Sequence, residues 1–329
     1  MKIKTRIIYI TLLVVLLMMQ SKISFATHYR AGEISYRWLS GRTYEITAIT
    51  YTDPTSSANP NTASVTIVFD DGSSAQILRT RLDPINQYIQ KNTYVCNHTY
   101  QSDGVYLINL TDLNRVDGIK NIRGGYSRDV AFYVETELRI DQSVGRNNSP
   151  VLKVPPVDNG CEGFVYIHNP GAYDPDGDSL SYELIPPKQG KGVNVPEYTT
   201  PEYTNSIDID PTTGELIWNT PKIFNTVSIY NIAIKITEWR GNLRIGYIVR
   251  DMQIRVENCV NTPPVIAKMK DYCVEANSQV QFNVTASDVN AFQLVTLEGY
   301  GATFDPALTD YPATITPASP VGNPVNASF

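Results

Sequence analysis

Three aspartates close together give the clearest chemical signal in the sequence. Asp174, Asp176 and Asp178 fall within five residues, separated by single residues that include a proline and a glycine. Carboxylates packed this closely repel one another unless a cation neutralises them, and calcium accepts irregular sets of oxygen ligands. We therefore expect a calcium site here. The alternative is a solvated acidic turn whose aspartates accept hydrogen bonds from backbone N–H groups.

The spacing of this loop differs from that of an EF-hand. With Asp174 at position one, the glycine falls at position four, and position twelve is Ile185 where an EF-hand has glutamate. A second copy of the loop lies 114 residues later, where Asn290 stands in place of Asp176 and Phe292 in place of Asp178. We expect any site in the second copy to be much weaker or absent.

The four cysteines allow disulfide bonds in an exported chain. Cys161 and Cys259 lie near the start and the end of one predicted domain, where the first and last strands of a sandwich approach each other, so we favour their pairing. Cys273 is either unpaired or a competing partner for Cys259. Cys96 has His98 two residues away, but no third group orients this pair as nucleophile and base.

Trp239 is the residue we consider for ligand stacking. It lies in the predicted turn at residues 238–242, where an exposed indole could stack on a sugar or on a partner protein. The simpler alternative is that the ring folds back onto the end of a sandwich. Trp218, inside the run Leu216-Ile217-Trp218, is expected in a core.

Known catalytic patterns do not occur in the sequence. The three histidines, His28, His98 and His168, are far apart and outside any zinc motif, and there is no Gly-x-Ser-x-Gly or phosphate-binding glycine loop. The sequence neither indicates nor excludes the paired carboxylates of a glycoside hydrolase, because such residues are distant in sequence. We predict that the chain is not an enzyme.

Residues 1–26 have the three regions of a secretory signal peptide, with basic residues first, then an apolar run, then Ser24-Phe25-Ala26. The apolar run, Ile7–Met19, is too short to span a bilayer, so we expect no integral membrane segment after cleavage. Cleavage after Ala26 leaves 23 basic and 33 acidic residues. We expect a secreted or cell-surface protein, and the acidic charge disfavours a nucleic-acid partner.

The composition of the full chain, 42% apolar with 21 tyrosines, 21 prolines and 20 glycines, is typical of strands and turns. Apolar residues alternate over residues 130–140, with mostly polar residues between them that predict a solvated second face. Shorter alternating runs occupy residues 65–69 and 105–110, and a pair of long strands is expected at 230–236 and 252–256, joined near residues 240–242. No stretch shows a sustained helical period.

Two similar Asn- and Pro-containing linkers, at residues 145–150 and 258–264, divide the chain. A shift of 114 residues aligns them and the acidic loops that follow, which favours a tandem repeat. We predict β-sandwiches at 27–146 and 147–260, and a truncated third one at 261–329, since Phe329 aligns with Glu215, before the last two long strands of the preceding copy.

Several segments resemble the N-terminal part of the gliding motility-associated C-terminal domain proteins of Bacteroidetes. The segments are residues 28–36 (HYRAGEISY), 44–47 (YEIT), 98–106 (HTYQSDGVY), 147–152 (NNSPVL) and 168–182 (HNPGAYDPDGDSLSY). The resemblance implies tandem immunoglobulin-like sandwiches, the first PKD-like and the second cadherin-like. It adds support for calcium at Asp174, Asp176 and Asp178, and implies export by the type IX route, although no C-terminal sorting domain is visible.

We therefore expect a non-enzymatic secreted or cell-surface protein for adhesion or scaffolding, associated with gliding motility by resemblance. Its partner would be a cell-surface or extracellular protein or a polysaccharide, and calcium would stiffen the repeats. The first alternative is a carbohydrate-binding module of a polysaccharide-handling surface protein that uses Trp239. The second is an enzyme whose catalytic part follows Phe329.

Overall fold

The computed structural model describes residues 29–55, 63–112, 115–157, 159–270, 272–275, 277–290, 292–299, 301–306 and 309–329. The predicted signal peptide lies outside the described residues. Those residues form strands and two short 3-10 turns, η1 (Arg123–Gly125) and η2 (Ala302–Phe304), and no α-helix. The all-β prediction is confirmed. No helix in the described part of the chain is long and apolar enough to cross a membrane.

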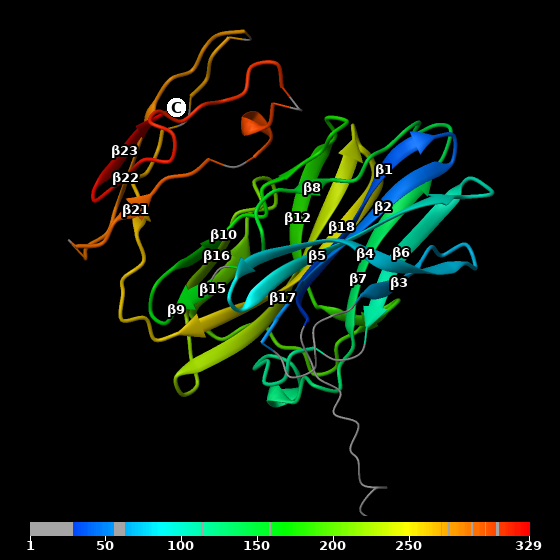
Figure 1. Ribbon diagram of the computed structural model, residues 1–329, viewed down its shortest axis with the longest axis horizontal. Coiled ribbons are helices and arrows are strands. Elements are labelled where there is room, and N and C mark those ends of the chain that lie inside the picture. Colours follow the sequence, from blue (N-terminus) through cyan, green and yellow to red (C-terminus); the bar gives the residue numbers. More distant parts are fainter. Residues whose placement is uncertain are drawn as a thin grey trace, which may run out of the picture.

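The first seven strands form most of one large sheet (Figure 1). They are β1 (Tyr29–Ser40), β2 (Thr43–Thr52), β3 (Ser64–Val68), β4 (Ser74–Asn86), β5 (Ile89–Thr99), β6 (Gly104–Asp112) and β7 (Phe132–Ile140). Their order in the sheet is β1-β2-β5-β4-β3-β6-β7, with antiparallel neighbours throughout. Their inward side chains enclose one hydrophobic core, which contains Tyr44, Ile46, Ile108 and Val134.

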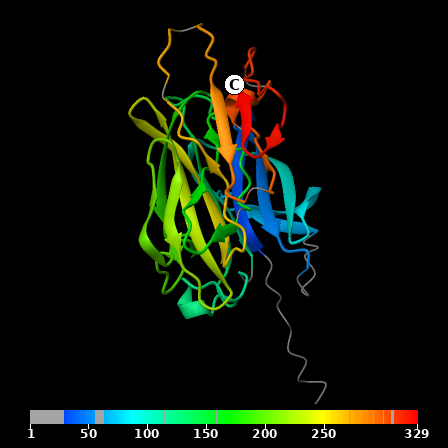
Figure 2. The same cartoon turned by 90° about the vertical axis from the view of Figure 1, so that its left-hand side faces the viewer.

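Eleven strands follow between the first linker and the second. They are β8 (Val151–Leu152), β9 (Asn159–Cys161), β10 (Tyr166–His168), β11 (Ala172–Tyr173), β12 (Ser179–Ile185), β13 (Lys188–Gly190), β14 (Val193–Asn194), β15 (Tyr203–Ile209), β16 (Leu216–Pro221), β17 (Val227–Arg240) and β18 (Leu243–Glu257). A second core lies between β17, β18 and the small sheet β10-β16-β15, with Trp218 fully buried in it as expected. The facing layers, consistent with a β-sandwich, are visible in Figure 2.

We call β1–β7 the first group of strands and β8–β18 the second group. Strand β18 connects the two groups of strands. It pairs with β17 along one edge, and along the other with β7 at residues 246–248 and with β1 at residues 251–252. The predicted boundary between residues 146 and 147 does fall in the loop after β7. However, the segments on its two sides share one hydrogen-bonded sheet, which the alternating pattern of each strand could not reveal.

The shared sheet corrects one expectation about β7. Its second face, predicted to be solvated, is buried: Tyr133, Glu135 and Glu137 are each at most 9% exposed. Glu135 is neutralised by Lys188 Nζ at 2.5 Å and accepts hydrogen bonds from the hydroxyls of Tyr133 and Tyr247. Polar residues therefore occupy this face because the second group of strands covers it and supplies partners.

Two fully buried ion pairs also join the two groups. Arg115 donates to both carboxylate oxygens of Asp251 at 2.7 and 2.8 Å, and Arg250 donates to Glu33 at 2.5 Å. All four side chains are at most 7% exposed. Each pair has one member before residue 147 and one after it, so separating the groups would leave charges buried without partners.

The last segment forms β19 (Val265–Ile266), β20 (Asn283–Ser287), β21 (Val295–Thr296), β22 (Val321–Gly322) and β23 (Val325–Ser328) around a small third core. Lys153 contacts it through an ion pair of 2.7 Å with Asp305. Its first strand pairing repeats an earlier one: Val151 pairs with Tyr173 and Leu152 with Ala172, while Val265 pairs with Ser287 and Ile266 with Ala286. Each of these positions is shifted by 114 residues, the offset found in the sequence.

Candidate functional site

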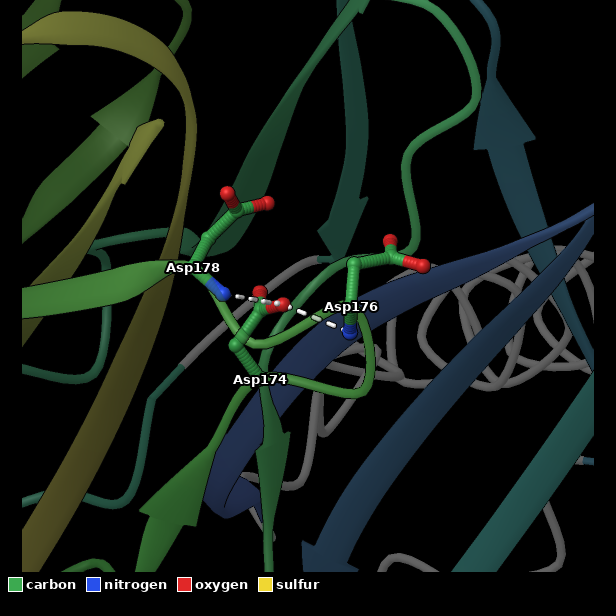
Figure 3. A group of neighbouring side chains, drawn as sticks. All are labelled: Asp174, Asp176 and Asp178. Atoms are coloured by element: carbon green, nitrogen blue, oxygen red, sulfur yellow. Dashed lines mark hydrogen bonds between the residues drawn. The ribbon is translucent and has the colours of Figure 1, made fainter. Parts of the chain in front are cut away.

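The acidic loop connects β11 to β12 and is shaped by Asp174. Its Oδ1 accepts hydrogen bonds from the backbone N–H of Asp176 at 2.8 Å and of Asp178 at 3.1 Å (Figure 3). Gly177 has a φ of 83°, a left-handed conformation that glycine adopts without strain. The loop therefore combines a tight turn with three carboxylates, of which Asp176 contacts the linker at residues 145–150.

The three predicted aspartates do lie together. One carboxylate oxygen from each falls within 4.8 Å of the other two, and no other such group of three occurs among the described residues. Figure 3 shows Asp174 between Asp176 and Asp178, with the outer two carboxylates on either side of it. This separation meets the first requirement for a shared cation, since each residue can offer one oxygen.

Two of the carboxylates already have polar partners. The guanidinium of Arg240 donates to both oxygens of Asp178, at 2.9 and 2.5 Å. Asp176 accepts a hydrogen bond from the backbone N–H of Asn148 at 2.7 Å and two more from its side-chain amide. The self-repulsion that suggested calcium is thus partly relieved by a residue at the end of β17 and by the linker.

Asp174 differs, because its Oδ2 is buried and has no hydrogen-bond partner among the described residues. The Asp174 side chain neighbours Glu238, a residue of β17 whose side chain is fully buried. Burial raises the pKa of Glu238 well above its usual range, and the negative charge of Asp174 raises it further. Burial likewise raises the pKa of Asp174.

Asn147 completes this polar cluster, which we call the junction cluster: Asp174, Asp176, Asp178, Glu238, Arg240, Asn147 and Asn148. The Asn147 amide donates to Glu238 at 3.0 Å and to the hydroxyl of Tyr36 at 3.0 Å, and its carbonyl oxygen accepts from Arg240. Sequence reasoning missed Glu238 and Arg240, because both follow the acidic loop by about 60 residues. Only the pairing of β12 with β17 brings them to it.

The donor set fits a hard cation at Asp174. All the candidate ligand atoms are carboxylate oxygens, and the buried Asp174 Oδ2 lacks a donor. Two species can satisfy this atom: a cation, or a proton shared between Asp174 and Glu238. The Asp178 carboxylate is the least available ligand, because a cationic guanidinium, that of Arg240, holds both of its oxygens, whereas the neutral Asn148 holds those of Asp176.

The second copy of the loop keeps two equivalent hydrogen bonds and only one of the three aspartates. Asp288 Oδ1 accepts the backbone N–H of Asn290 at 2.7 Å, and Asn290 accepts the N–H of Thr262 at 3.3 Å. These bonds correspond, 114 residues later, to those of Asp174, Asp176 and Asn148. Phe292, in place of Asp178, is fully exposed. The hydrogen bonds that Asp288 and Asn290 make therefore need only one of the three aspartates.

The structure joins Cys161 and Cys259 in a disulfide, the pairing that their positions favoured. β9 lies parallel to the end of β18, which brings the two Cα atoms to 5.4 Å. Cys96 and Cys273 are free. Burial raises the pKa of the Cys96 thiol to about 11, so it is protonated at neutral pH, and His98 Nε2 donates to the Asp71 carboxylate at 2.7 Å instead.

Trp239 is not at the tip of a loop. It lies on β17, half-buried, and its indole N–H donates to Ser181 Oγ on the neighbouring strand at 2.8 Å. The turn between β17 and β18 is formed by Gly241 and Asn242 instead. The indole N–H is therefore already used within the fold, and stacking of a ligand on the ring face stays a prediction.

Comparison with known proteins gives no match, either to a family model or to a curated sequence.

Proposed function

We propose that this chain is a non-enzymatic secreted or cell-surface protein that serves adhesion or scaffolding. The observation that carries the proposal is the double pairing of β18 with β17 on one edge and with β7 and β1 on the other. In this proposal it makes the strands β1–β7 and β17–β18 one stiff β unit, suited to hold a binding surface at a fixed distance and orientation. In this proposal the unit consists of immunoglobulin-like sandwiches, PKD-like and then cadherin-like, as the sequence resemblance implies.

The disulfide supports the proposed location. Disulfides persist in oxidising compartments and are rare in a reducing cytosol. The Cys161–Cys259 bond closes a loop with a sequence separation of 98 residues, which constrains the unfolded chain strongly. Together with the predicted signal peptide, this bond favours a protein that works outside the cytosol, with an extracellular protein or polysaccharide as partner.

Deletion of the coding sequence in the producing organism tests the proposal directly. We expect fewer cells to attach to glass and agar, and we expect the purified chain, added in excess, to reduce the attachment of wild-type cells. Unchanged attachment in both experiments would contradict the adhesive role. A deletion that also slows spreading on agar would support the association with gliding motility.

We further propose that calcium binds at Asp174, with Asp176 and Asp178 contributing oxygens. The support is the buried, unpartnered Asp174 Oδ2 beside two more carboxylates. Because β18 already fixes the two groups of strands relative to each other, calcium would stabilise the linker at residues 145–150 and not reorient the groups. The expected effect is a change in melting temperature without a change in overall dimensions.

The calcium site is tested by melting the full chain in calcium and in excess chelator. At 100 times its dissociation constant a ligand adds about 2.7 kcal/mol, which corresponds to a shift of about 5 °C or more. We expect this shift for the wild type and for the matched control Asp208→Asn, an exposed aspartate of β15. We expect it to be lost in Asp176→Asn. If calcium did not raise the melting temperature of the wild type, the calcium site would be wrong, and Arg240 would be the group that neutralises the loop.

A further inference from the structure

A second surface feature lies at the end of the first group of strands. The ends of β2, β5 and β7 and the turn between β1 and β2 surround a pocket of about 600 Å³, within the size range of small-ligand sites. Trp38 forms one wall, and the buried rings of Tyr44 and Tyr100 lie beneath. None of these aromatic residues belongs to the junction cluster.

Trp38 is held in place before any ligand arrives. Its indole N–H donates to the carbonyl of Gly41 at 3.0 Å, and its ring packs against the first core. Its backbone N–H donates to Asn148 Oδ1 at 2.8 Å, which ties the wall to the linker. A rigid indole of this kind offers an apolar face at little cost in conformational entropy.

Charged and amide side chains form the rim. Arg42 Nε donates to Asp103 Oδ1 at 2.7 Å, and both side chains are about 40% exposed, so the remaining guanidinium N–H groups and carboxylate oxygens face outward. Arg146 is exposed, and its side chain makes no hydrogen bond or ion pair with the described part of the chain. Gln101 and Gln142 add amide donors and acceptors.

The charges of this rim balance. Asp141 accepts two hydrogen bonds from Ser143 that lower its pKa, so it stays ionised and, with Asp103, offsets the two arginines. Tyr44 adds a neutral hydroxyl, because burial and the charge of Asp103 raise its pKa to about 12. A ligand with many hydroxyls and no net charge matches this arrangement better than an ion does.

We propose that this pocket binds a neutral saccharide, with the C–H face of one pyranose ring against Trp38 and its hydroxyls on Arg42, Asp103 and Gln142. Planar side chains that can donate or accept two parallel hydrogen bonds suit the vicinal hydroxyls of a sugar. This site goes beyond the proposed adhesive role by naming a ligand class, and it does not require a cation at Asp174.

Affinity electrophoresis of the full chain tests the proposal, in native gels that contain laminarin, xyloglucan or mannan, with alginate as the acidic comparison. We expect retardation by at least one neutral polymer, and an at least tenfold weaker affinity for Arg42→Ala and Trp38→Ala. Arg42 is exposed, so Arg42→Ala keeps the test valid even if Trp38→Ala fails to fold. Arg37→Ala, an exposed arginine of β1 paired with Glu45, is the matched control and should bind like the wild type.

Three outcomes would overturn the proposal. The first is no retardation by any neutral polymer. The second is equal retardation of Arg42→Ala and the wild type. The third is binding to alginate alone that disappears in high salt, which would mean simple attraction to the two arginines. Normal attachment of cells carrying Arg42→Ala, with saccharide binding lost, would separate this site from the adhesive role.

Discussion

At the scale of single residues, Glu238 is unusual among the described carboxyl groups, because its side chain is fully buried and its pKa is raised. It is a fully buried carboxyl beside another carboxyl, Asp174, and its hydrogen bond from Asn147 does not offset the loss of hydration. Its pKa is therefore raised in the folded state, and the native protein binds a proton that the unfolded chain releases at lower pH. The Glu238 carboxyl therefore stabilises the fold least at a pH at which it is ionised.

The raised pKa of Glu238 predicts a stabilising variant, Glu238→Gln, in the presence of chelator. Glu238 carries a raised folded-state pKa, so the wild type loses stability as pH rises from about 4.3 through that raised pKa. Glutamine cannot ionise, keeps the acceptor for Asn147, and can donate to Asp174 Oδ2. Melting curves from pH 4 to 8 should show the variant more stable than the wild type at pH 7, by more than about 1 kcal/mol.

The matched control for this variant is Glu183→Gln on β12, which removes an exposed glutamate paired with Lys235. Its melting curve should follow that of the wild type at every pH. If Glu238→Gln lost stability at pH 7, the ionised carboxylate would be required in the fold, and the idea of a shared proton with Asp174 would be wrong.

The same residues show how far the sequence alone leads at a site. The three aspartates are visible because they are neighbours in the chain, and their proximity in space follows from the turn. Arg240 and Glu238 cannot be linked to them by spacing, because the link depends on the register of β12 against β17. The sequence therefore indicates the ligands and omits the groups that compete with a metal for them.

At the scale of elements, strand β7 shows that the sequence pattern predicts the strand and its core face, whereas the burial of its second face depends on packing. Its alternation identifies the strand and its core face, both of which the structure confirms. The polar residues that alternate with the core residues were wrongly predicted to be solvated. A strand face whose polar residues are buried against polar partners has the same sequence pattern as a face exposed to solvent. Glu135 needs Lys188 and Tyr247 as well as Tyr133 of its own strand, and the first two belong to the other group of strands, more than 50 residues away in sequence.

The segment that precedes β7 carries the clearest prediction at this scale. Arg115 is fully buried and contacts Asp251 of β18 through two hydrogen bonds, and Asn231 also bonds to both residues. Arg115→Met would leave the Asp251 carboxylate buried without its partner, which costs about 3–5 kcal/mol. Urea denaturation, followed by tryptophan fluorescence, measures this loss.

Two further variants isolate the cause. Arg128→Met removes an arginine of the same segment whose ion pair with Asp117 is exposed, and it should leave the denaturation midpoint unchanged. Arg115→Met combined with Asp251→Asn removes the unpaired charge and should recover part of the loss. If the double variant were as unstable as Arg115→Met, lost packing around the guanidinium would be the cause.

At the scale of the whole molecule, the linker at residues 145–150 separates two segments in sequence but not in the sheet. β18 pairs with both β7 and β1, the first and last strands in the sheet order of the first group (Figure 1). The hydrogen-bonded path from β1 to β7 therefore closes on itself only when β18 of the second group is included. Linker composition indicates where the chain turns. It carries no information about pairings formed between residues more than 100 positions apart.

Truncation therefore distinguishes one folding unit from two. Residues 27–260 should melt in a single cooperative transition, because both buried ion pairs and the β7–β18 pairing lie within them. Residues 27–146 alone would expose Tyr133, Glu135 and Glu137 of β7 and leave Glu33 without Arg250. We expect this fragment to aggregate or to melt without cooperativity in calorimetry. A dispersed NMR spectrum and a sharp transition for residues 27–146 would instead mean that β18 docks onto a domain already complete, and the stiffness would then depend on that docking alone.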